Sequence, residues 1–156
     1  MNKIDSSIEM ISVVINCYNG SQLLKECIDS VLIQTHQYFE IIFWDNQSED
    51  CSKQIIESYN DTRIKYFYSP RHTSLYEARN LAISKCKGKY VTFIDCDDIW
   101  LQNKLSLQID IFRKFKINCL GSNFFIKEGN TEKIAYKKML TFQKMNNVLT
   151  KYQIGF

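Results

Sequence analysis

The sequence lacks the pattern of a zinc site. It has six cysteines but only two histidines, and no two cysteines stand three positions apart. Structural zinc sites draw four such ligands from closely spaced pairs, so this class is excluded. We therefore expect the cysteines to be reduced thiols.

Long hydrophobic runs are also missing. Residues 1–10 include Lys3, Asp5 and Glu9, and the first apolar run is broken at Asn16. A signal peptide needs a longer apolar stretch, and a transmembrane helix needs about 20 apolar residues. We expect a cytoplasmic protein that does not span the membrane.

A large excess of one charge is absent too. The chain has 20 Lys and Arg against 17 Asp and Glu, a net charge of +3. Nucleic-acid binding usually needs a stronger basic surface, so nucleic acid is not an expected partner. The C-terminal third is locally basic. Such a surface is either simply solvated or allows peripheral association with the inner face of the membrane. The basic residues there are Lys127, Lys133, Lys137, Lys138, Lys144 and Lys151.

Short apolar runs alternate with segments of helical period. This alternation is typical of βα units and predicts an α/β fold with a mostly parallel, Rossmann-like sheet flanked by helices. Strands are predicted at Ile11–Ile15, Phe39–Trp44, Ile64–Tyr68, Tyr90–Ile94 and Cys119–Ile126, with a further short strand after a turn at Gly129–Asn130. Helices are predicted over Leu24–Leu32, around Ile55–Ile56, from Leu75 to about Cys86, through Leu105, Ile109 and Phe112, and around Leu140–Val148. Ser74 and Glu77 have the spacing of a capping box at the third helix.

We see no internal repeat or linker, and expect residues 1–156 to form a single domain.

Polar residues follow three predicted strands, at Asn16–Asn19, Asp45–Ser48 and Asp95–Asp98. In an open α/β sheet the carboxyl ends of parallel strands share one edge, where ligands bind. Turn formation alone explains the first two groups. It explains the third poorly, because three carboxylates after an apolar strand repel one another unless a cation is bound. Such oxygen ligands suit Mg²⁺ or Mn²⁺, although Asp98 is also placed to cap the next helix.

Taken together, the separated blocks resemble family 2 of the glycosyltransferases in order and spacing. The resemblance covers Ile11 to roughly Phe125. It is carried by Ile11–Asn19, Leu32–Thr35, Phe39–Ile42, Asp45–Ser48, Ala78–Asn80, Gly88–Tyr90, Phe93–Trp100, Leu101 and Lys104–Leu105.

This resemblance implies a glycosyltransferase A fold, a nucleoside-diphosphate sugar donor, first of all a UDP-sugar, and a divalent metal, Mn²⁺ or Mg²⁺. It implies inverting transfer of the sugar to a hydroxyl of a glycan or lipid-linked acceptor, and places the family in polysaccharide biosynthesis.

The resemblance also implies roles for individual residues. Asn16 and Tyr18 stand where the first strand meets the base and ribose, with Tyr18 stacking on the base. Asp45 and Asn46 match the acidic pair that contacts the base. Gln47 stands where the family usually has glycine.

The remaining implied roles concern the diphosphate. Asp95 matches the acid near ribose and metal, and Asp97 the direct metal ligand. Arg79 matches an arginine of the donor site or the acidic motif, with a structural ion pair as an equal alternative.

The general base that inverting members use lies later in the chain than the acidic motif. Glu128 and Glu132 are the only acids after Asp110, and they lie in a predicted turn and edge strand. The sequence thus predicts a chain that stops before the acceptor-binding region.

Two alternatives remain. The first is a donor-binding module without turnover. The second is a sugar nucleotidyltransferase, which is disfavoured because no Gly-rich phosphate loop follows the first strand.

Overall fold

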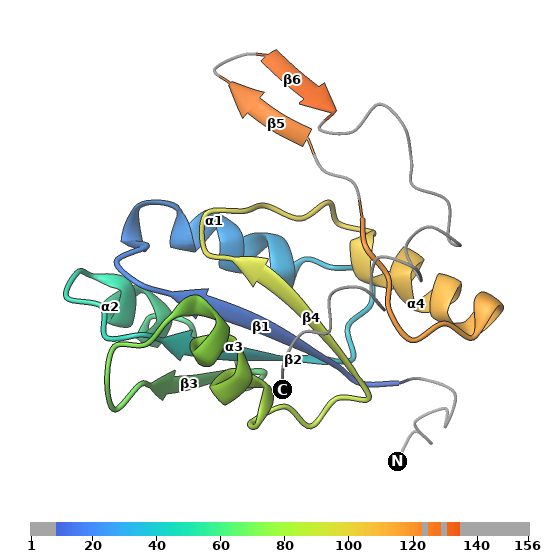
Figure 1. The fold of residues 1–156 in the computed structure, drawn as a ribbon. Coiled ribbons are helices and arrows are strands. Elements are labelled where there is room, and N and C mark those ends of the chain that lie inside the picture. Colours follow the sequence, from blue (N-terminus) through green and yellow to red (C-terminus); the bar gives the residue numbers. More distant parts are fainter. Residues whose placement is uncertain (1–8, 123–124, 129–130, 135–156) are drawn as a thin grey trace. The chain divides into compact units, whose positions relative to one another are not determined.

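The computed structural model describes residues 9–122, 125–128 and 131–134, and the chain divides into two compact units, residues 1–115 and 116–156. The first unit holds a four-stranded sheet with helices around it (Figure 1). Its strands are β1 (Ile11–Cys17), β2 (Phe39–Asp45), β3 (Ile64–Tyr68) and β4 (Tyr90–Asp95). Its helices are α1 (Ser21–Leu32), α2 (Ser52–Glu57), α3 (Leu75–Ile83) and α4 (Lys104–Phe115).

All four strands of this sheet are parallel, in the order β3-β2-β1-β4. A helix separates each strand from the next along the chain, which is how parallel neighbours are connected. The prediction of a parallel α/β sheet flanked by helices is confirmed.

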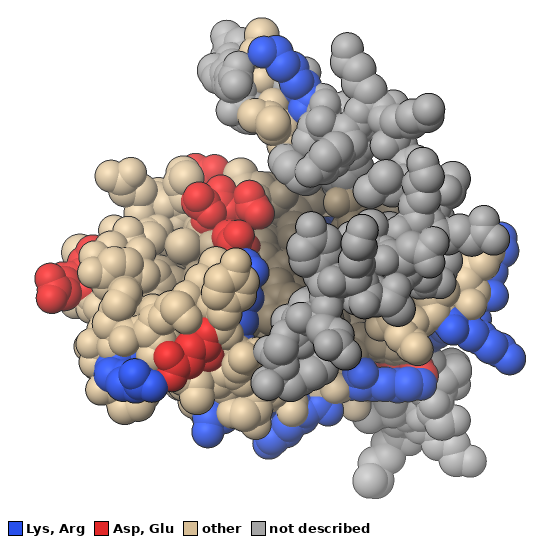
Figure 2. Space-filling model, viewed as in Figure 1, with Lys and Arg blue, Asp and Glu red and all other residues tan. Residues whose placement is uncertain are grey.

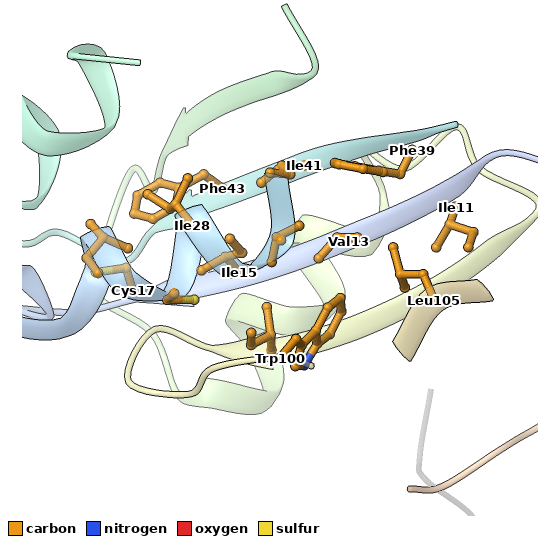
Figure 3. Packing of buried hydrophobic residues seen from close by; sticks show 14 of the residues in the cluster. Ile11, Val13, Ile15, Cys17, Ile28, Phe39, Ile41, Phe43, Trp100 and Leu105 are labelled. Carbon is orange, nitrogen blue, oxygen red and sulfur yellow. The ribbon is translucent and has the colours of Figure 1, made fainter. Parts of the chain in front are cut away.

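The two faces of the sheet are covered by different helices. Every residue of β1 and β2 is buried, as expected for central strands of a parallel sheet. Val13, Ile15 and Cys17 point towards α1, together with Trp100 and Leu105 (Figure 3). The intervening β1 residues face α3, whose Ala78 and Ala82 pack on Val14, Ile42 and Trp44.

Helix α3 begins at the predicted capping box. The Ser74 hydroxyl oxygen accepts a hydrogen bond from the Glu77 backbone N–H at 3.3 Å. The helix ends at Ile83, earlier than the predicted Cys86. The difference arises because Lys85 and Cys86 donate to carbonyls three residues back, which tightens the chain into a turn.

The second unit contains an antiparallel hairpin of β5 (Phe125–Glu128) and β6 (Thr131–Ile134). The predicted strand at Cys119–Ile126 is wrong over residues 119–122, which lie outside any described strand. Gly121 weakens β structure there, and the strand begins only where β6 provides a partner. The predicted helix at Leu140–Val148 falls outside the described residues. Within the described part of the chain, no helix is both long and apolar enough to cross a bilayer.

Candidate functional site

The carboxyl ends of three neighbouring strands meet at one edge of the sheet, as the sequence predicts. In the strand register, Asn16 of β1 lies beside Trp44 of β2 and Asp95 of β4. Cys17 lies beside Asp45 in the same way. This is the edge at which open α/β sheets bind their ligands.

An aromatic pair lies just after β1. The Tyr18 side chain is exposed, and its ring centroid is 4.4 Å from that of His72, with the ring planes at 60°. His72 Nδ1 lies 3.0 Å from the Asn46 carbonyl oxygen. A carbonyl can only accept, so Nδ1 donates; in the neutral form of the ring Nε2 is then an acceptor. The Tyr18 ring is therefore accessible and lies against His72, while its expected stacking on a base stays a prediction.

The Asn46 carboxamide is buried and holds the segment between β3 and α3. Its Oδ1 accepts from the backbone N–H of Thr73 at 3.1 Å and from the Thr73 hydroxyl at 2.9 Å. Its Nδ2 donates to the Thr73 carbonyl at 2.8 Å. Asn46 thus positions the segment that carries His72. Its expected contact with a base stays a prediction.

Asp45 is buried and makes hydrogen bonds within the protein. Its Oδ1 accepts from the Ser48 backbone N–H at 2.7 Å, and its Oδ2 accepts from the Tyr66 hydroxyl at 2.9 Å. Burial and the bond to Asp45 raise the pKa of Tyr66. A buried carboxylate needs such partners, and here they fix the turn after β2. The expected contact of Asp45 with a base likewise stays a prediction.

The turns after β1 and β2 are bonded to each other. Asn19 donates its backbone N–H to the Ser48 hydroxyl at 3.0 Å, and its Oδ1 accepts from the Glu49 backbone N–H at 2.8 Å. Asn19 and Gln47 both have positive φ, at 53° and 68°. The left-handed backbone conformation of Gln47 favours glycine. This explains why the family that the sequence resembles usually has glycine at this position.

The acidic residue at the end of β4 is paired with an arginine of α3. Arg79 Nη2 donates to Asp95 Oδ1 at 2.7 Å, and the guanidinium carbon lies 5.5 Å from the centre of the Phe93 ring. The Asp95 side chain is 51% exposed and that of Arg79 is 31% exposed. Asp95 is thus held in place and remains accessible to a ligand, and Arg79 is its ion-pair partner at the carboxyl edge of the sheet.

Three buried N–H groups near this edge have no hydrogen-bond partner among the described residues. They are Nδ2 of Asn16, Nε1 of Trp44 and Nε of Arg79. Asn16 is the strand neighbour of both Trp44 and Asp95, and Asp95 is bonded to Arg79. Unsatisfied buried donors are rare, so this part of the sheet edge is suited to a ligand or water that offers oxygen acceptors.

Asp97 and Asp98 lie exposed in the turn after β4, which is closed by a bond from the Asp98 N–H to the Asp95 carbonyl at 3.0 Å. Acidic side chains gather over this loop (Figure 2). Burial and the charges of Asp97 and Asp95 raise the pKa of Asp98. Helix α4 begins only at Lys104, so the alternative that Asp98 caps the next helix is wrong.

The residues at this turn fit a divalent cation only in part. Asp95 and Asp97 offer exposed carboxylate oxygens, the ligand type that Mn²⁺ and Mg²⁺ prefer. Within the described residues no three carboxylate, thiol or imidazole groups form a metal-binding cluster. Two protein carboxylates therefore suit a metal that completes its coordination with substrate oxygens and water.

Three thiols, those of Cys17, Cys27 and Cys96, lie at the acidic turn. The neighbouring Cys96 thiol lowers the pKa of Cys17, against the effect of burial. The Cys17 thiol and burial raise the pKa of Cys96. Burial raises the pKa of Cys27 to about 12, and its Sγ donates to the Asp95 carbonyl at 3.5 Å.

A model of the Glycosyl transferase family 2 sequences matches residues 12–156, which is almost the whole chain. The chain belongs to glycosyltransferase family 2. Among curated relatives of this family 2 glycosyltransferase, the Escherichia coli protein UDP-Glc:alpha-D-GlcNAc-diphosphoundecaprenol beta-1,3-glucosyltransferase WfgD is 31% identical over 84% of this chain and 55% of its own length. The E. coli enzyme WfaP, described by the same activity, is 33% identical over 78% of this chain and 48% of its own length.

Solved structures show the same fold. The Staphylococcus aureus TarS fragment 1–349, crystallised with UDP, is 25% identical and superposes with a TM-score of 0.65 over 69% of this chain and 33% of that one. The mannosyltransferase PcManGT of Pyrobaculum calidifontis, solved with GDP-Man and Mn²⁺, has a TM-score of 0.64 over 69% of this chain and 33% of its own. At 19% identity it supports the fold alone. The family 2 glycosyltransferase chain thus has a glycosyltransferase A type fold and spans about half the length of the two E. coli relatives.

Some site residues of this family 2 glycosyltransferase cannot be found by reading strand ends. Thr73, His72 and Tyr66 reach the site from β3 and from the segment that follows it. Tyr66 lies within the predicted strand Ile64–Tyr68, and His72 and Thr73 lie between that strand and the capping box of α3; these positions are the sequence signal for them.

Proposed function

We propose that the chain binds a UDP-sugar at the carboxyl edge of the sheet and donates the sugar to an acceptor hydroxyl with inversion. The observation that carries this proposal is the Arg79–Asp95 ion pair at the end of β4, which holds an exposed carboxylate at this edge. The Asn16 amide, which has no hydrogen-bond partner among the described residues, lies on the neighbouring strand. It is supported by the donor named for the two E. coli relatives and by the UDP bound to the S. aureus structure.

In this proposal the base stacks on Tyr18, and the neighbouring His72 offers Nε2 as an acceptor for the imide N–H of uracil. Asn16 Nδ2 donates to an oxygen of the nucleoside. Asp45 and Asn46 act at the same pocket by fixing the turn after β2 and the segment that carries His72.

Asp95 and Asp97 would hold a divalent cation, Mn²⁺ or Mg²⁺, together with the diphosphate. When bound, the cation supplies positive charge that stabilises the leaving nucleoside diphosphate. Arg79 orients Asp95 and adds a second positive charge close to it. Inverting transfer also needs a carboxylate that takes the proton of the attacking hydroxyl.

The proposed acceptor is a sugar on a lipid diphosphate. It is supported by the names of the two E. coli relatives, whose acceptor is alpha-D-GlcNAc-diphosphoundecaprenol. Such an acceptor places the enzyme at the membrane surface as a peripheral protein.

Calorimetric titration with UDP, CDP and GDP, in excess Mn²⁺ and in a chelator, tests the donor site. We expect UDP to bind at least about tenfold more tightly with Mn²⁺ than without it, and more tightly than CDP. Binding that ignores the metal, or no binding of any nucleotide, would overturn the proposal. Transfer of sugar from UDP-glucose by the chain itself would in addition rule out a module that only binds the donor.

A further inference from the structure

Two cysteines are brought together at the edge of the proposed donor site. Cys17 is the last residue of β1, and Cys96 directly follows Asp95, the last residue of β4. The two strands are neighbours, and Asn16 pairs with Asp95, so the two cysteines occupy the next matching positions. Cys17 ends the row of β1 side chains that points towards α1 (Figure 3), and Cys96 packs against the same core.

The two thiols lie close together beside Gly20. Cys17 Sγ also donates a hydrogen bond to the Ser52 hydroxyl at 3.4 Å. Both sulfurs lie against Gly20. A Cβ on Gly20 would stand 2.5 Å from Cys96 Sγ, closer than atoms can approach, and 3.0 Å from Cys17 Sγ, a tight contact. The missing side chain of Gly20 therefore provides the space in which the two sulfurs meet.

We propose that Cys17 and Cys96 form an oxidative modification site at which a peroxide converts the thiol pair into a disulfide. The backbone placement suits the bond, because neighbouring strands lie about 4.8 Å apart and disulfides join Cα atoms about 4.4–6.8 Å apart. Cys96 is half-buried whereas Cys17 is 2% exposed, so Cys96 is the thiol that meets the oxidant first.

The chemistry balances with hydrogen peroxide as the oxidant. The Cys96 thiol gives up its proton and its sulfur attacks one peroxide oxygen; the O–O bond breaks, and the released hydroxide takes up that proton and leaves as water, giving a sulfenic acid. The Cys17 sulfur then attacks the Cys96 sulfur, the S–O bond breaks, and the hydroxyl leaves as a second water. Two thiols and one peroxide give one disulfide and two waters, so the two sulfurs lose two electrons to the peroxide oxygens.

This bond would disturb the proposed donor site, and that consequence rests on the proposed function. Cys96 stands between Asp95 and Asp97, and Cys17 stands between Asn16 and Tyr18. A disulfide brings the sulfurs to about 2.05 Å, well inside the contact distance of two sulfur atoms that are not bonded. Displacements of about 1 Å in such sites weaken function strongly. We therefore expect the oxidised chain to lose nucleotide affinity.

Other thiols provide the competing outcomes. Cys27 is buried close to the pair, with its Sγ bonded to the Asp95 carbonyl. Cys51 and Cys119 are exposed. These two form the matched control, because they are accessible to peroxide yet lie outside the pair.

The experiment treats the chain with hydrogen peroxide, blocks free thiols by alkylation and maps the peptides by mass spectrometry. We expect a crosslinked pair of peptides that contain Cys17 and Cys96, with a mass two hydrogen atoms below the sum of the two reduced peptides. Dithiothreitol should reverse this crosslink. The Cys51→Ser/Cys119→Ser double variant should still form it, whereas Cys96→Ser should not. A crosslink that involves Cys27 instead, or alkylated Cys17 and Cys96 after oxidation, would overturn the proposal.

The effect on binding is measured separately, by titration with UDP and Mn²⁺ before and after peroxide. We expect affinity to fall at least about tenfold on oxidation and to return with dithiothreitol, while Cys96→Ser has the same affinity before and after treatment. Unchanged affinity in a chain with the mapped crosslink would refute the coupling to the donor site. If neither the reduced nor the oxidised chain binds a nucleotide, the proposed function fails, while the peptide map alone decides whether the thiol pair is an oxidation site.

Discussion

Asn46 and Thr73 are joined by three hydrogen bonds, two accepted by Asn46 Oδ1 and one donated by Asn46 Nδ2. Asn46→Asp replaces the donor with a carboxylate oxygen that faces the Thr73 carbonyl. We expect a loss of about 1–3 kcal/mol in the free energy of unfolding, because a buried bond is replaced by a repulsive contact. Urea unfolding measures this loss. Asn60→Asp, at an exposed position, is the control, and equal urea midpoints for the two variants would contradict the prediction.

Gln47 has a φ of 68°, which costs a non-glycine residue about 1–2 kcal/mol. Gln47→Gly should therefore raise the free energy of unfolding by about 1 kcal/mol, after the larger entropy of glycine in the unfolded chain is subtracted. Gln47→Ala also loses the 3.4 Å bond to the Ser69 carbonyl but keeps the strained backbone, so it should show no gain. If alanine stabilised the protein as much as glycine, backbone strain would not be the cause.

Asp50 caps the starts of two helices, accepting from the backbone N–H of Ser21 in α1 and of Ser52 in α2, both at 2.9 Å. Burial opposes ionisation of Asp50, but hydrogen bonds from Ser52 and Ser21 outweigh it and lower the pKa to about 2. Asp50→Ala should cost about 1–2 kcal/mol of the free energy of unfolding at pH 7.

The cost of Asp50→Ala should also depend on pH. The unfolded pKa of aspartate is about 3.9, so the folded value is depressed and the stabilisation is present above about pH 4. It is lost as the pH falls towards 2. Urea midpoints of wild type and Asp50→Ala should therefore converge between about pH 4 and pH 2, and a constant difference over this range would show that the charge of Asp50 does not matter.

Substitution of Arg79 tests whether this residue acts in the donor site or only in a structural ion pair. The Arg79–Asp95 pair is partly exposed, so Arg79→Met should change the free energy of unfolding by less than about 1 kcal/mol. We expect the same variant to lower UDP affinity in Mn²⁺ at least about tenfold, with Arg79→Lys in between. A stability loss with unchanged UDP affinity would leave only the structural role.

The strands and helices of the first unit could be predicted because their apolar periodicity is uninterrupted. Ile64–Tyr68 is β3 as predicted, and α1 buries the expected Leu24, Cys27, Ile28 and Val31. Periodicity says little about where a helix tightens into a turn, so the end of α3 was placed too late. It also says nothing about which partner a strand finds, so the strand at Cys119–Ile126 began too early.

The site could be predicted as a set of strand ends but not as a set of contacts. Parallel topology alone places Asn16, Asp45 and Asp95 at one edge of the sheet. The sequence does not show that Asn46 bonds to Thr73, because that contact depends on how the segment after β3 folds back. The sequence does not show that Cys17 and Cys96 lie close together either, because that depends on the pairing and register of β1 and β4.

The metal dependence of UDP binding in Asp97→Asn tests the central claim most directly. Calorimetric titration with and without Mn²⁺ compares this variant with wild type and with Asp110→Asn, which removes an exposed carboxylate of α4. We predict that wild type and Asp110→Asn gain at least about tenfold in UDP affinity from Mn²⁺, and that Asp97→Asn gains little. A full metal-dependent gain in Asp97→Asn would contradict the assignment of the acidic turn after β4 as the metal and diphosphate site.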